Sequence, residues 1–386
     1  MTSFSGLLLL GMILSAIAHM IIPQVPPWLA GTLAWLAMFV LLPALVMLQR
    51  IQAMTLISIG LLCMYWGWSR GIDTDIMALI SKNDSLLALL AGVSYLRLVT
   101  LPSDDESQIL PTGRAAFLPT LIGTHLFSSV INLSALLIVT ERLQQKQQLN
   151  RVTVVPLMRA FSAAAFWSPF FAAMGVALTY APGASLTTLV LQGIPLVFVA
   201  LAYTAREFYR CSDEEIKQYQ GYPVHFSALW VPALLVFCVL VVHQFKPDFS
   251  VILIVAGLSL LITVLISMLR DPEDATRALR RHTLEQLPKM SGELALFLSA
   301  GVLAVGLSTL FQSFDALSPN LEFSFQLAVM LLLLIVVLAV VGIHPVISIA
   351  TLGVWIAPLH PDPDVLGTIF LSGWAIGVVA APLSGL

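Results

Sequence analysis

Charged residues are scarce in this chain. Lysine, arginine, aspartate and glutamate make up 10% of its 386 residues, whereas hydrophobic residues make up 59%. A soluble domain cannot bury that much apolar surface, so the composition predicts a polytopic membrane protein whose main surroundings are the lipid bilayer. The formal net charge of -3 provides no basic excess of the kind that binds nucleic acid, so we expect no nucleic-acid partner.

Cysteines and cofactor motifs are also scarce. Cys63, Cys211 and Cys238 are far apart, which predicts neither a disulfide framework nor a metal site. The sequence has no phosphate-binding Walker loop, no His-Glu-x-x-His pattern and no long polar domain. We therefore expect no bound cofactor, no enzyme activity and no nucleotide-driven pumping by this chain.

Apolar runs of about 20 residues, the length that crosses a bilayer as a helix, fill most of the sequence. We expect such helices at 5–22, 28–48, 52–69, 76–98, 160–180, 184–204, 225–243, 249–269, 290–313 and 365–386. Two further apolar stretches, 115–140 and 323–358, carry polar residues in their middles. The predicted fold is all-α. The last run reaches Leu386 without a polar end, so we expect the natural protein to continue beyond it.

One short pattern occurs in both of these stretches. Gly123-Thr-His125-Leu-Phe-Ser-Ser129-Val-Ile-Asn132 is matched by Gly342-Ile-His344-Pro-Val-Ile-Ser348-Ile-Ala-Thr351. A histidine in hydrocarbon is costly and is normally tolerated beside water, a partner or a substrate. Its occurrence in two matching surroundings predicts a transporter whose two related halves meet at a central site.

Other pairs extend the duplication. Asp84 and Gly92-Val93 match Glu293 and Gly301-Val302, and Ser168-Pro169 matches Ala381-Pro382. We therefore divide the chain into an N-terminal transmembrane helix (1–27), a first repeat (28–204) and a second, inverted repeat (205–386) that lacks its last helix. The odd number of crossings between matching segments makes the two repeats antiparallel.

Basic residues predict the orientation, because positively charged loops stay in the cytoplasm. Three loops carry clusters of basic residues: Arg142, Lys146, Arg151 and Arg159; Arg206, Arg210 and Lys217; and Arg270, Arg277, Arg280, Arg281 and Lys289. If 115–140 and 323–358 are re-entrant hairpins that open to opposite faces, all of these loops and the N-terminus face the cytoplasm. Arg70 and Lys246 are isolated exceptions that fall on the outside in this count. Gly123 and Gly342–Pro345 are then the expected helix breaks. An alternative count makes 76–101 and 290–313 the hairpins.

The candidate binding residues surround these breaks. They are His125, Ser129, Asn132, Ser168, Pro169, His344, Ser348, Thr351, Pro382 and Ser384. Histidines can donate hydrogen bonds to an anion or carry protons, and hydroxyl and amide groups can bind an anion or a cation without burying a charge. Prolines interrupt helices and direct the partial charges of their ends into a cavity. The structural alternatives are histidines that cap backbone, hydroxyls bonded to their own helix and simple proline kinks.

In the order of these segments and in these polar tips and proline breaks, the chain resembles the ion transporter superfamily, especially its divalent anion/sodium symporter branch. The family's Ser-Asn-Thr signature is not reproduced here. The resemblance implies a homodimer with a static scaffold, and a mobile elevator domain formed by the hairpins and the broken helices.

The sequence thus predicts a secondary active transporter in a bacterial cytoplasmic membrane. It would move a small anionic organic solute in symport with Na⁺ or H⁺, with Na⁺ as a coupling ion rather than a bound cofactor. Two alternatives remain open. One is a cation/proton antiporter of the same superfamily. The other is an intramembrane enzyme or lipid flippase in which His125–Ser129 and His344–Ser348 act as catalytic pairs.

Overall fold

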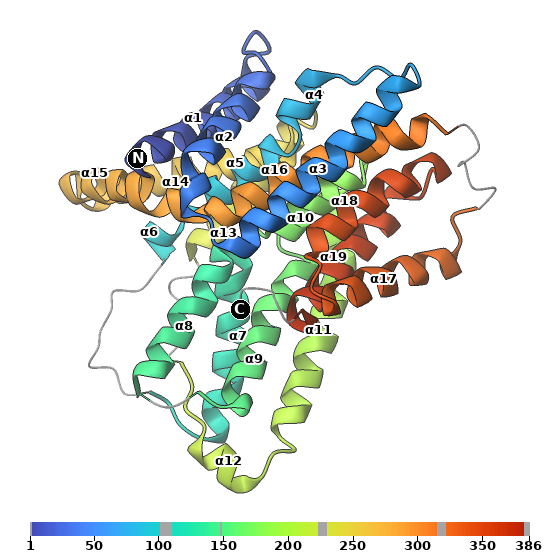
Figure 1. Cartoon of the computed structure of the whole chain (residues 1–386). Helices are drawn as coiled ribbons and strands as arrows, with labels where there is room; N and C mark the ends of the chain where they lie inside the picture. Colours follow the sequence, from blue (N-terminus) through green and yellow to red (C-terminus); the bar gives the residue numbers. More distant parts are fainter. Residues whose placement is uncertain (1, 101–109, 147–148, 223–229, 315–321, 382–386) are drawn as a thin grey trace.

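The chain folds as a bundle of helices (Figure 1). The computed structural model describes residues 2–100, 110–146, 149–222, 230–314 and 322–381. Across these ranges the chain contains no β-strand, and Thr112 and Gln220 form an isolated bridge. The predicted all-α class is confirmed for this part of the chain.

The first half contains α1 (Thr2–Ile21), α2 (Trp28–Leu41), α3 (Met47–Ser69), α4 (Ile76–Ser81), α5 (Asp84–Ser94), α6 (Arg97–Thr100), α7 (Arg114–Ile131), α8 (Leu133–Lys146), α9 (Arg151–Ala163), α10 (Ala172–Tyr180) and α11 (Leu186–Phe208). The second half contains α12 (Asp213–Gln218), α13 (Trp230–Phe245), α14 (Val251–Arg270), α15 (Pro272–Arg281), α16 (Ser291–Gln312), α17 (Phe325–Val340), α18 (Pro345–Ile356) and α19 (Pro363–Ala380).

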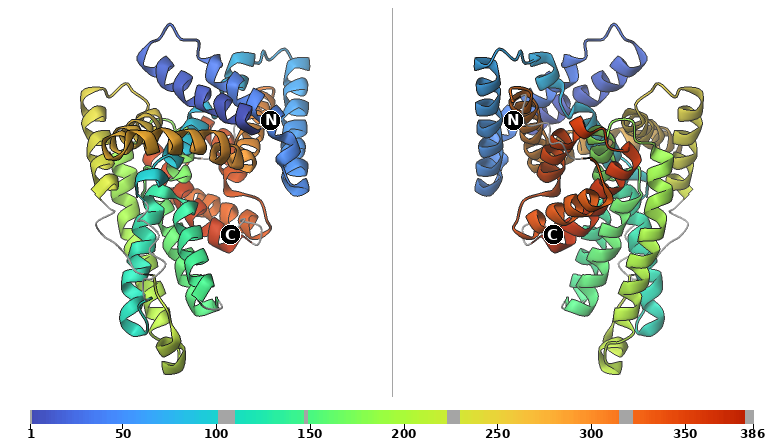
Figure 2. Two further views of the ribbon diagram at one scale, coloured as in Figure 1. Left: turned by 90° about the vertical axis from the view of Figure 1, so that its left-hand side faces the viewer. Right: turned by 90° about the vertical axis from the view of Figure 1, so that its right-hand side faces the viewer.

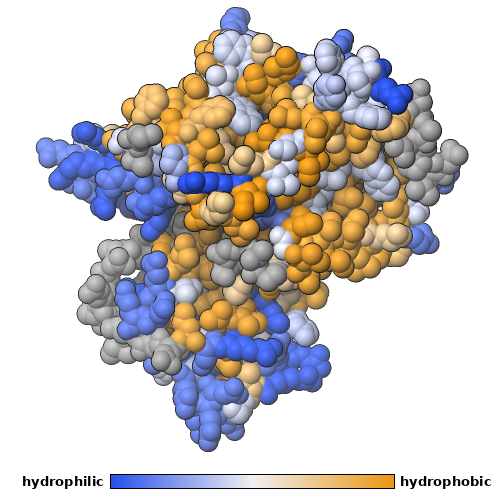
Figure 3. All heavy atoms as spheres, viewed as in Figure 1, coloured by the Kyte–Doolittle hydropathy of each residue, from blue (hydrophilic) through white to orange (hydrophobic). Residues whose placement is uncertain are grey.

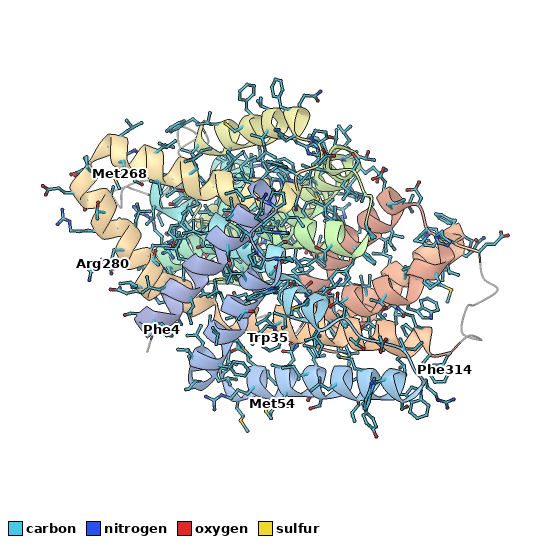
Figure 4. All side chains as sticks on the ribbon, turned by 90° about the horizontal axis from the view of Figure 1, so that it is seen from above. Phe4, Trp35, Met54, Met268, Arg280 and Phe314 are labelled. Atoms are coloured by element: carbon cyan, nitrogen blue, oxygen red, sulfur yellow. The ribbon has the colours of Figure 1, made fainter. Side chains whose placement is uncertain are left out.

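The surface of the bundle is that of a multi-pass membrane protein. Within the described ranges, seven helical stretches are long and apolar enough to cross a bilayer. Apolar residues cover much of the face shown in Figure 3, and Figure 4 shows Met54 of α3 pointing away from the bundle. Met54, Leu62 and Trp68 are 66%, 68% and 67% exposed, as expected for side chains that contact lipid.

Two long helix pairs join the halves through glycines. α3 packs along α16, where Gly60 and Gly306 face each other with no side chain between the two backbones. α5 packs along α14, where a Cβ atom at Gly92 would lie 2.8 Å from the carbonyl oxygen of Ala256. Close approach of this kind is how membrane helices gain packing energy without a hydrophobic driving force.

The segments that carry the first part of the predicted site extend from this body. α7, α8, α9, α11 and α12 form a projection on one side of the molecule (Figures 1 and 2). Arg151 and Arg159 of α9 share a pocket with Glu207 and Glu215, so the first two predicted basic segments adjoin at the end of the projection. The third basic segment, α15, lies elsewhere in Figure 1.

Three sequence-based expectations are wrong. The helix expected at 76–98 is interrupted at Lys82–Asn83, because Asn83 adopts a left-handed conformation with φ 69°. Gly123 does not break its helix: α7 runs through it to Ile131, because a single glycine inside a helix costs only about 1 kcal/mol relative to alanine. The alternative hairpin at 290–313 is instead the uninterrupted 22-residue helix α16, which does not reverse direction.

Candidate functional site

The first interruption lies between α7 and α8. Asn132 ends α7 with φ 52° and ψ -135°, a backbone conformation that residues other than glycine rarely adopt. Its amide nitrogen Nδ2 donates a hydrogen bond to the carbonyl oxygen of Phe170 at 3.0 Å. This bond fixes the end of α7 against a segment 38 residues later in the chain.

That later segment is the second interruption. α9 tightens into a 3₁₀ turn at Ala164–Phe166, and α10 begins only at Ala172. Pro169 lies in the intervening stretch and has no N–H group to continue a helix. The Ser168 hydroxyl donates to the carbonyl oxygen of Ser129 and accepts the Phe170 N–H at 3.2 Å. The interruption predicted at Ser168-Pro169 is confirmed, and it contacts the end of α7 at both Ser129 and Asn132.

His125 lies inside α7 and is held by α9 and the stretch after it. The Trp167 indole N–H, which can only donate, points to Nε2 of His125 at 3.2 Å. The ring proton of neutral His125 therefore sits on Nδ1, which donates to the carbonyl oxygen of Ala160 at 3.0 Å. Both ring nitrogens are engaged by protein, so His125 positions α7 on α9 in this conformation.

The interruption in the second half lies between α17 and α18. Gly342 has φ 101°, and His344 caps the N-terminus of α18 by accepting the Val346 N–H on Nδ1 at 3.2 Å. A neutral His344 then carries its proton on Nε2. Its ring packs edge-on against Trp374 of α19, with centroids 5.2 Å apart. The break predicted at Gly342–Pro345 is confirmed, and His344 retains a free N–H donor within the described part of the chain.

His344 also lines a cavity of about 360 Å³ between the α17–α18 break and α3. The polar members of the lining are His344, Gln52 and Thr55. Gln52 and Thr55 were not predicted, although they lie three positions apart near the start of α3. Such spacing places two side chains on one face of a helix, and this was the signal that could have identified them.

α19 lies between the two interrupted regions. It packs on α17 and α18 and also on α9 and α10. The Ser162 hydroxyl of α9 donates to the carbonyl oxygen of Ala375, and the adjacent Trp374 contacts His344. Since Ala160 of α9 binds His125, the two histidines are linked through α9 and α19. None of four cavities formed by the described residues, of about 360, 290, 240 and 490 Å³, is lined by both of them.

Several buried oxygens near the breaks have no hydrogen-bond partner among the described residues. These oxygens belong to Thr124, Ser128 and Asn132, which follow one another at intervals of four residues along α7, and to Ser348 on α18. The hydroxyls of Thr124, Ser128 and Ser348 belong to side chains no more than 3% exposed. An unpaired buried hydroxyl costs roughly 1–3 kcal/mol, so each of these groups would gain from a polar partner. Thr124 and Ser128 extend the predicted set.

The structure therefore brings the predicted residues into two groups. His125, Ser129, Asn132, Ser168 and Pro169 lie around the first two breaks. His344, Ser348 and Thr351 lie at the start of α18, with Thr351 two turns after the cap. Pro382 and Ser384 fall outside the described residues.

Neither predicted histidine–serine pair is joined by a hydrogen bond. The Ser129 hydroxyl donates to the carbonyl oxygen of Leu126 at 2.7 Å, and that of Ser348 has no described partner. The nitrogens of His125 bind Ala160 and Trp167. A serine nucleophile needs a base within hydrogen-bond reach, so this conformation does not present a catalytic pair.

The sequence was compared with models of known protein families and with curated proteins. No family model matches the chain, and no curated protein matches it.

Proposed function

We propose that the chain is a secondary active transporter of a small anionic organic solute, organised like the divalent anion/sodium symporters that its sequence resembles. The observation that carries the proposal is the contact of Asn132 with the interrupted stretch at Ser168–Phe170. Non-helical backbone inside a membrane protein is tolerated where it is buried in protein or lines a cavity. In transporters such breaks supply the groups that bind substrate and coupling ion.

Helix lengths support re-entrant hairpins at α7–α8 and α17–α18. α8, α17 and α18 contain 14, 16 and 12 residues. At 1.5 Å per residue these helices reach about 18–24 Å, less than the roughly 30 Å of a hydrocarbon core. In the proposed arrangement, each pair enters the membrane and returns to the same side.

Two sets of contacts support inverted repeats. In the first half α3 precedes α5, and in the second half α14 precedes α16, so α3 corresponds to α14 and α5 to α16. The helices that pack together are α3 with α16 and α5 with α14. Exchanging the halves turns one pair into the other, as a two-fold axis requires. In addition, Ser162 and Ala375 each lie seven positions before the matching prolines, and they are hydrogen-bonded to each other. Residues at equivalent positions can meet only near such an axis.

The chemistry of the breaks supports an anionic solute and a coupling cation. The cavity beside His344 is lined by the His344 ring N–H, the Gln52 amide and the Thr55 hydroxyl, and the described part of its lining has no carboxylate. Such donors bind an anion without a buried positive charge. The unpaired oxygens of Thr124, Ser128 and Asn132 provide ligands for Na⁺. H⁺ is the alternative coupling ion.

The test is uptake into proteoliposomes that contain the purified chain. Labelled monocarboxylates, dicarboxylates and sulfonates are offered under an imposed Na⁺ gradient or pH gradient. We expect uptake of at least one solute to exceed that of empty liposomes and to require one of the gradients. Cation–proton exchange in the absence of any organic solute would instead assign the antiporter function. A preceding thermal-shift screen identifies the solutes to test, because a ligand that binds only the folded state raises its melting temperature.

A further inference from the structure

A second cavity, of about 290 Å³, opens between α4, α16 and α18. Its lining includes Asp73, Asp75, Lys82, Ser308, Gln312 and Val354. Val354 is near the C-terminal end of α18, whereas His344 caps its N-terminus. The cavity is therefore separate from the one beside His344, and α18 connects the two.

Lys82 is the cationic residue of this cavity, and the interruption between α4 and α5 holds it in place. The next residue, Asn83, is 5% exposed and donates to the carbonyl oxygen of Phe297 on α16 at 2.8 Å. Asn83 also accepts the Tyr180 hydroxyl at 3.1 Å. The stem of Lys82 lies against Gly301. Four elements of the fold, α4, α5, α10 and α16, thus fix the position of one lysine.

The ammonium of Lys82 lacks a carboxylate partner among the described residues. It lies over the Tyr180 ring, 5.3 Å from the centroid, and no described ion pair includes it. An ionisable residue within the membrane region is costly and normally marks a substrate or ion pathway. Tyr180 satisfies the cation only in part, because a ring face attracts a cation more weakly than a carboxylate does. Lys82 is therefore positioned to receive an anionic group.

The opposite charge sits at the mouth of the same cavity. Asp73 and Asp75 are exposed, and Asp75 uses Oδ1 to accept the Met77 N–H at 2.8 Å, which starts α4. Ser308 and Gln312 add a hydroxyl and an amide to the wall of α16, where the Gln312 amide donates to Ser308 at 3.2 Å. The lining thus has a positive group in its interior, two negative groups at its edge and neutral polar groups on one wall.

We propose that this cavity binds a small solute that carries both a carboxylate and an ammonium group. The carboxylate binds Lys82 and the ammonium group faces Asp73 and Asp75. A purely anionic solute would meet repulsion from the two aspartates, and a simple amine would leave Lys82 without a partner. The inference rests on the proposed transport function and changes its solute class: the carboxylate of the proposed solute is kept, an ammonium group balances its charge, and the cavity is the entry subsite.

Equilibrium binding to the purified chain in lipid nanodiscs tests this. The probes are glycine and 4-aminobutyrate, with butyrate and butylamine as analogues that carry one charge each. Lys82→Gln should weaken binding of the better amino-carboxylate by about tenfold or more, the usual effect of losing a charged hydrogen bond. Lys246→Gln is the matched control, since Lys246 also lies over an aromatic ring, that of Phe249, at 5.9 Å, but outside this cavity.

Asp73→Asn provides a variant at an exposed position, where a folding defect is not expected. It should weaken binding of the amino-carboxylate and strengthen binding of butyrate, because one of the two carboxylates that repel an anion is removed. Equal binding of butyrate and 4-aminobutyrate, or an affinity that Lys82→Gln does not alter, would overturn the proposal. Proteoliposome uptake is measured separately. Binding that depends on Lys82 without any uptake would overturn the proposed function alone, whereas uptake that is indifferent to Lys82 and Asp73 would overturn this inference alone.

Discussion

Ser162 and Ala375 are 213 residues apart in the chain and are joined by a hydrogen bond from the Ser162 hydroxyl to the Ala375 carbonyl oxygen. Ser162 is 4% exposed and lies on α9, and Ala375 is 2% exposed and lies on α19. Each residue precedes the proline of its own half by the same seven positions. The bond thus connects α9 and α19 at corresponding points of the proposed repeats.

Removal of this hydroxyl should loosen the contact between the halves. Ser162→Ala leaves the buried Ala375 carbonyl without the donor, and it should lower the free energy of unfolding by about 1 kcal/mol. Ser69→Ala is the control, because the exposed Ser69 hydroxyl donates only to Trp66 in its own turn of helix, at 2.6 Å. Thermal unfolding in detergent measures both variants. Equal melting temperatures for the two would show that the Ser162 bond contributes nothing.

His344 has two functions in the proposed mechanism, and one substitution separates them. His344→Asn keeps an oxygen that can cap α18 through the Val346 N–H, but it removes the Nε2–H beside the cavity. Asparagine is among the best capping residues, so the melting temperature should stay close to that of the natural chain. Solute uptake should fall about tenfold or more if Nε2 donates to the anion. His344→Ala, which loses the cap as well, should lower both quantities.

Helices were predictable where the sequence has a long, uninterrupted apolar run. In such runs α1, α11, α14 and α16 begin and end within a few residues of the predicted bounds. The breaks were predictable only where proline or glycine forces them, as at Ser168-Pro169 and Gly342. Asn132 and Lys82–Asn83 break their helices through tertiary bonds to Phe170 and Phe297. Local sequence carries no signal for such bonds, and for this reason the break was placed at Gly123.

For the candidate site too, the sequence predicted what depends on local pattern and missed what depends on tertiary packing. Polar residues near the breaks could be named from the repeated pattern, and five of them do lie together around Asn132 and Ser168. The engagement of His125 by Trp167, and the free N–H of His344, depend on which aromatic ring packs beside each histidine. The pattern treats the two histidines as equivalent, whereas the packing makes one a positioning residue and leaves the other facing a cavity.

Asn132 combines backbone strain with a hydrogen bond, and two variants separate these effects. Glycine adopts the observed conformation freely, so Asn132→Gly should recover part of a strain of order 1–3 kcal/mol while losing the bond to Phe170. We expect a melting temperature equal to or above that of the natural chain, with reduced uptake. Asn132→Ala keeps the strain and loses the bond, so its melting temperature should fall. A lower melting temperature for the glycine variant than for the alanine variant would contradict this account.

Gly92 should tolerate no side chain, because its helix lies directly on α14. In Gly92→Ala the new methyl group would lie 2.8 Å from the carbonyl oxygen of Ala256, and the helices would have to separate, at a cost of roughly 1–3 kcal/mol for overpacking. Gly257→Ala on α14 is the control, since its new atom would meet Ile17 no closer than 3.5 Å. Thermal unfolding should place the first variant below the natural chain and the second at or above it, because alanine favours a helix over glycine.

The proposed inverted architecture places the α3–α4 loop and α12 on opposite sides of the membrane. The α12 end adjoins the basic residues of α9, and positive residues favour the cytoplasm, so the Asp75 side should face outward. In a variant with its three natural cysteines replaced by serine, a membrane-impermeant maleimide should label Asp75→Cys in intact cells. It should label Glu214→Cys only after permeabilisation. Labelling of both positions from the same side would contradict the orientation and, with it, the two-sided access that transport requires.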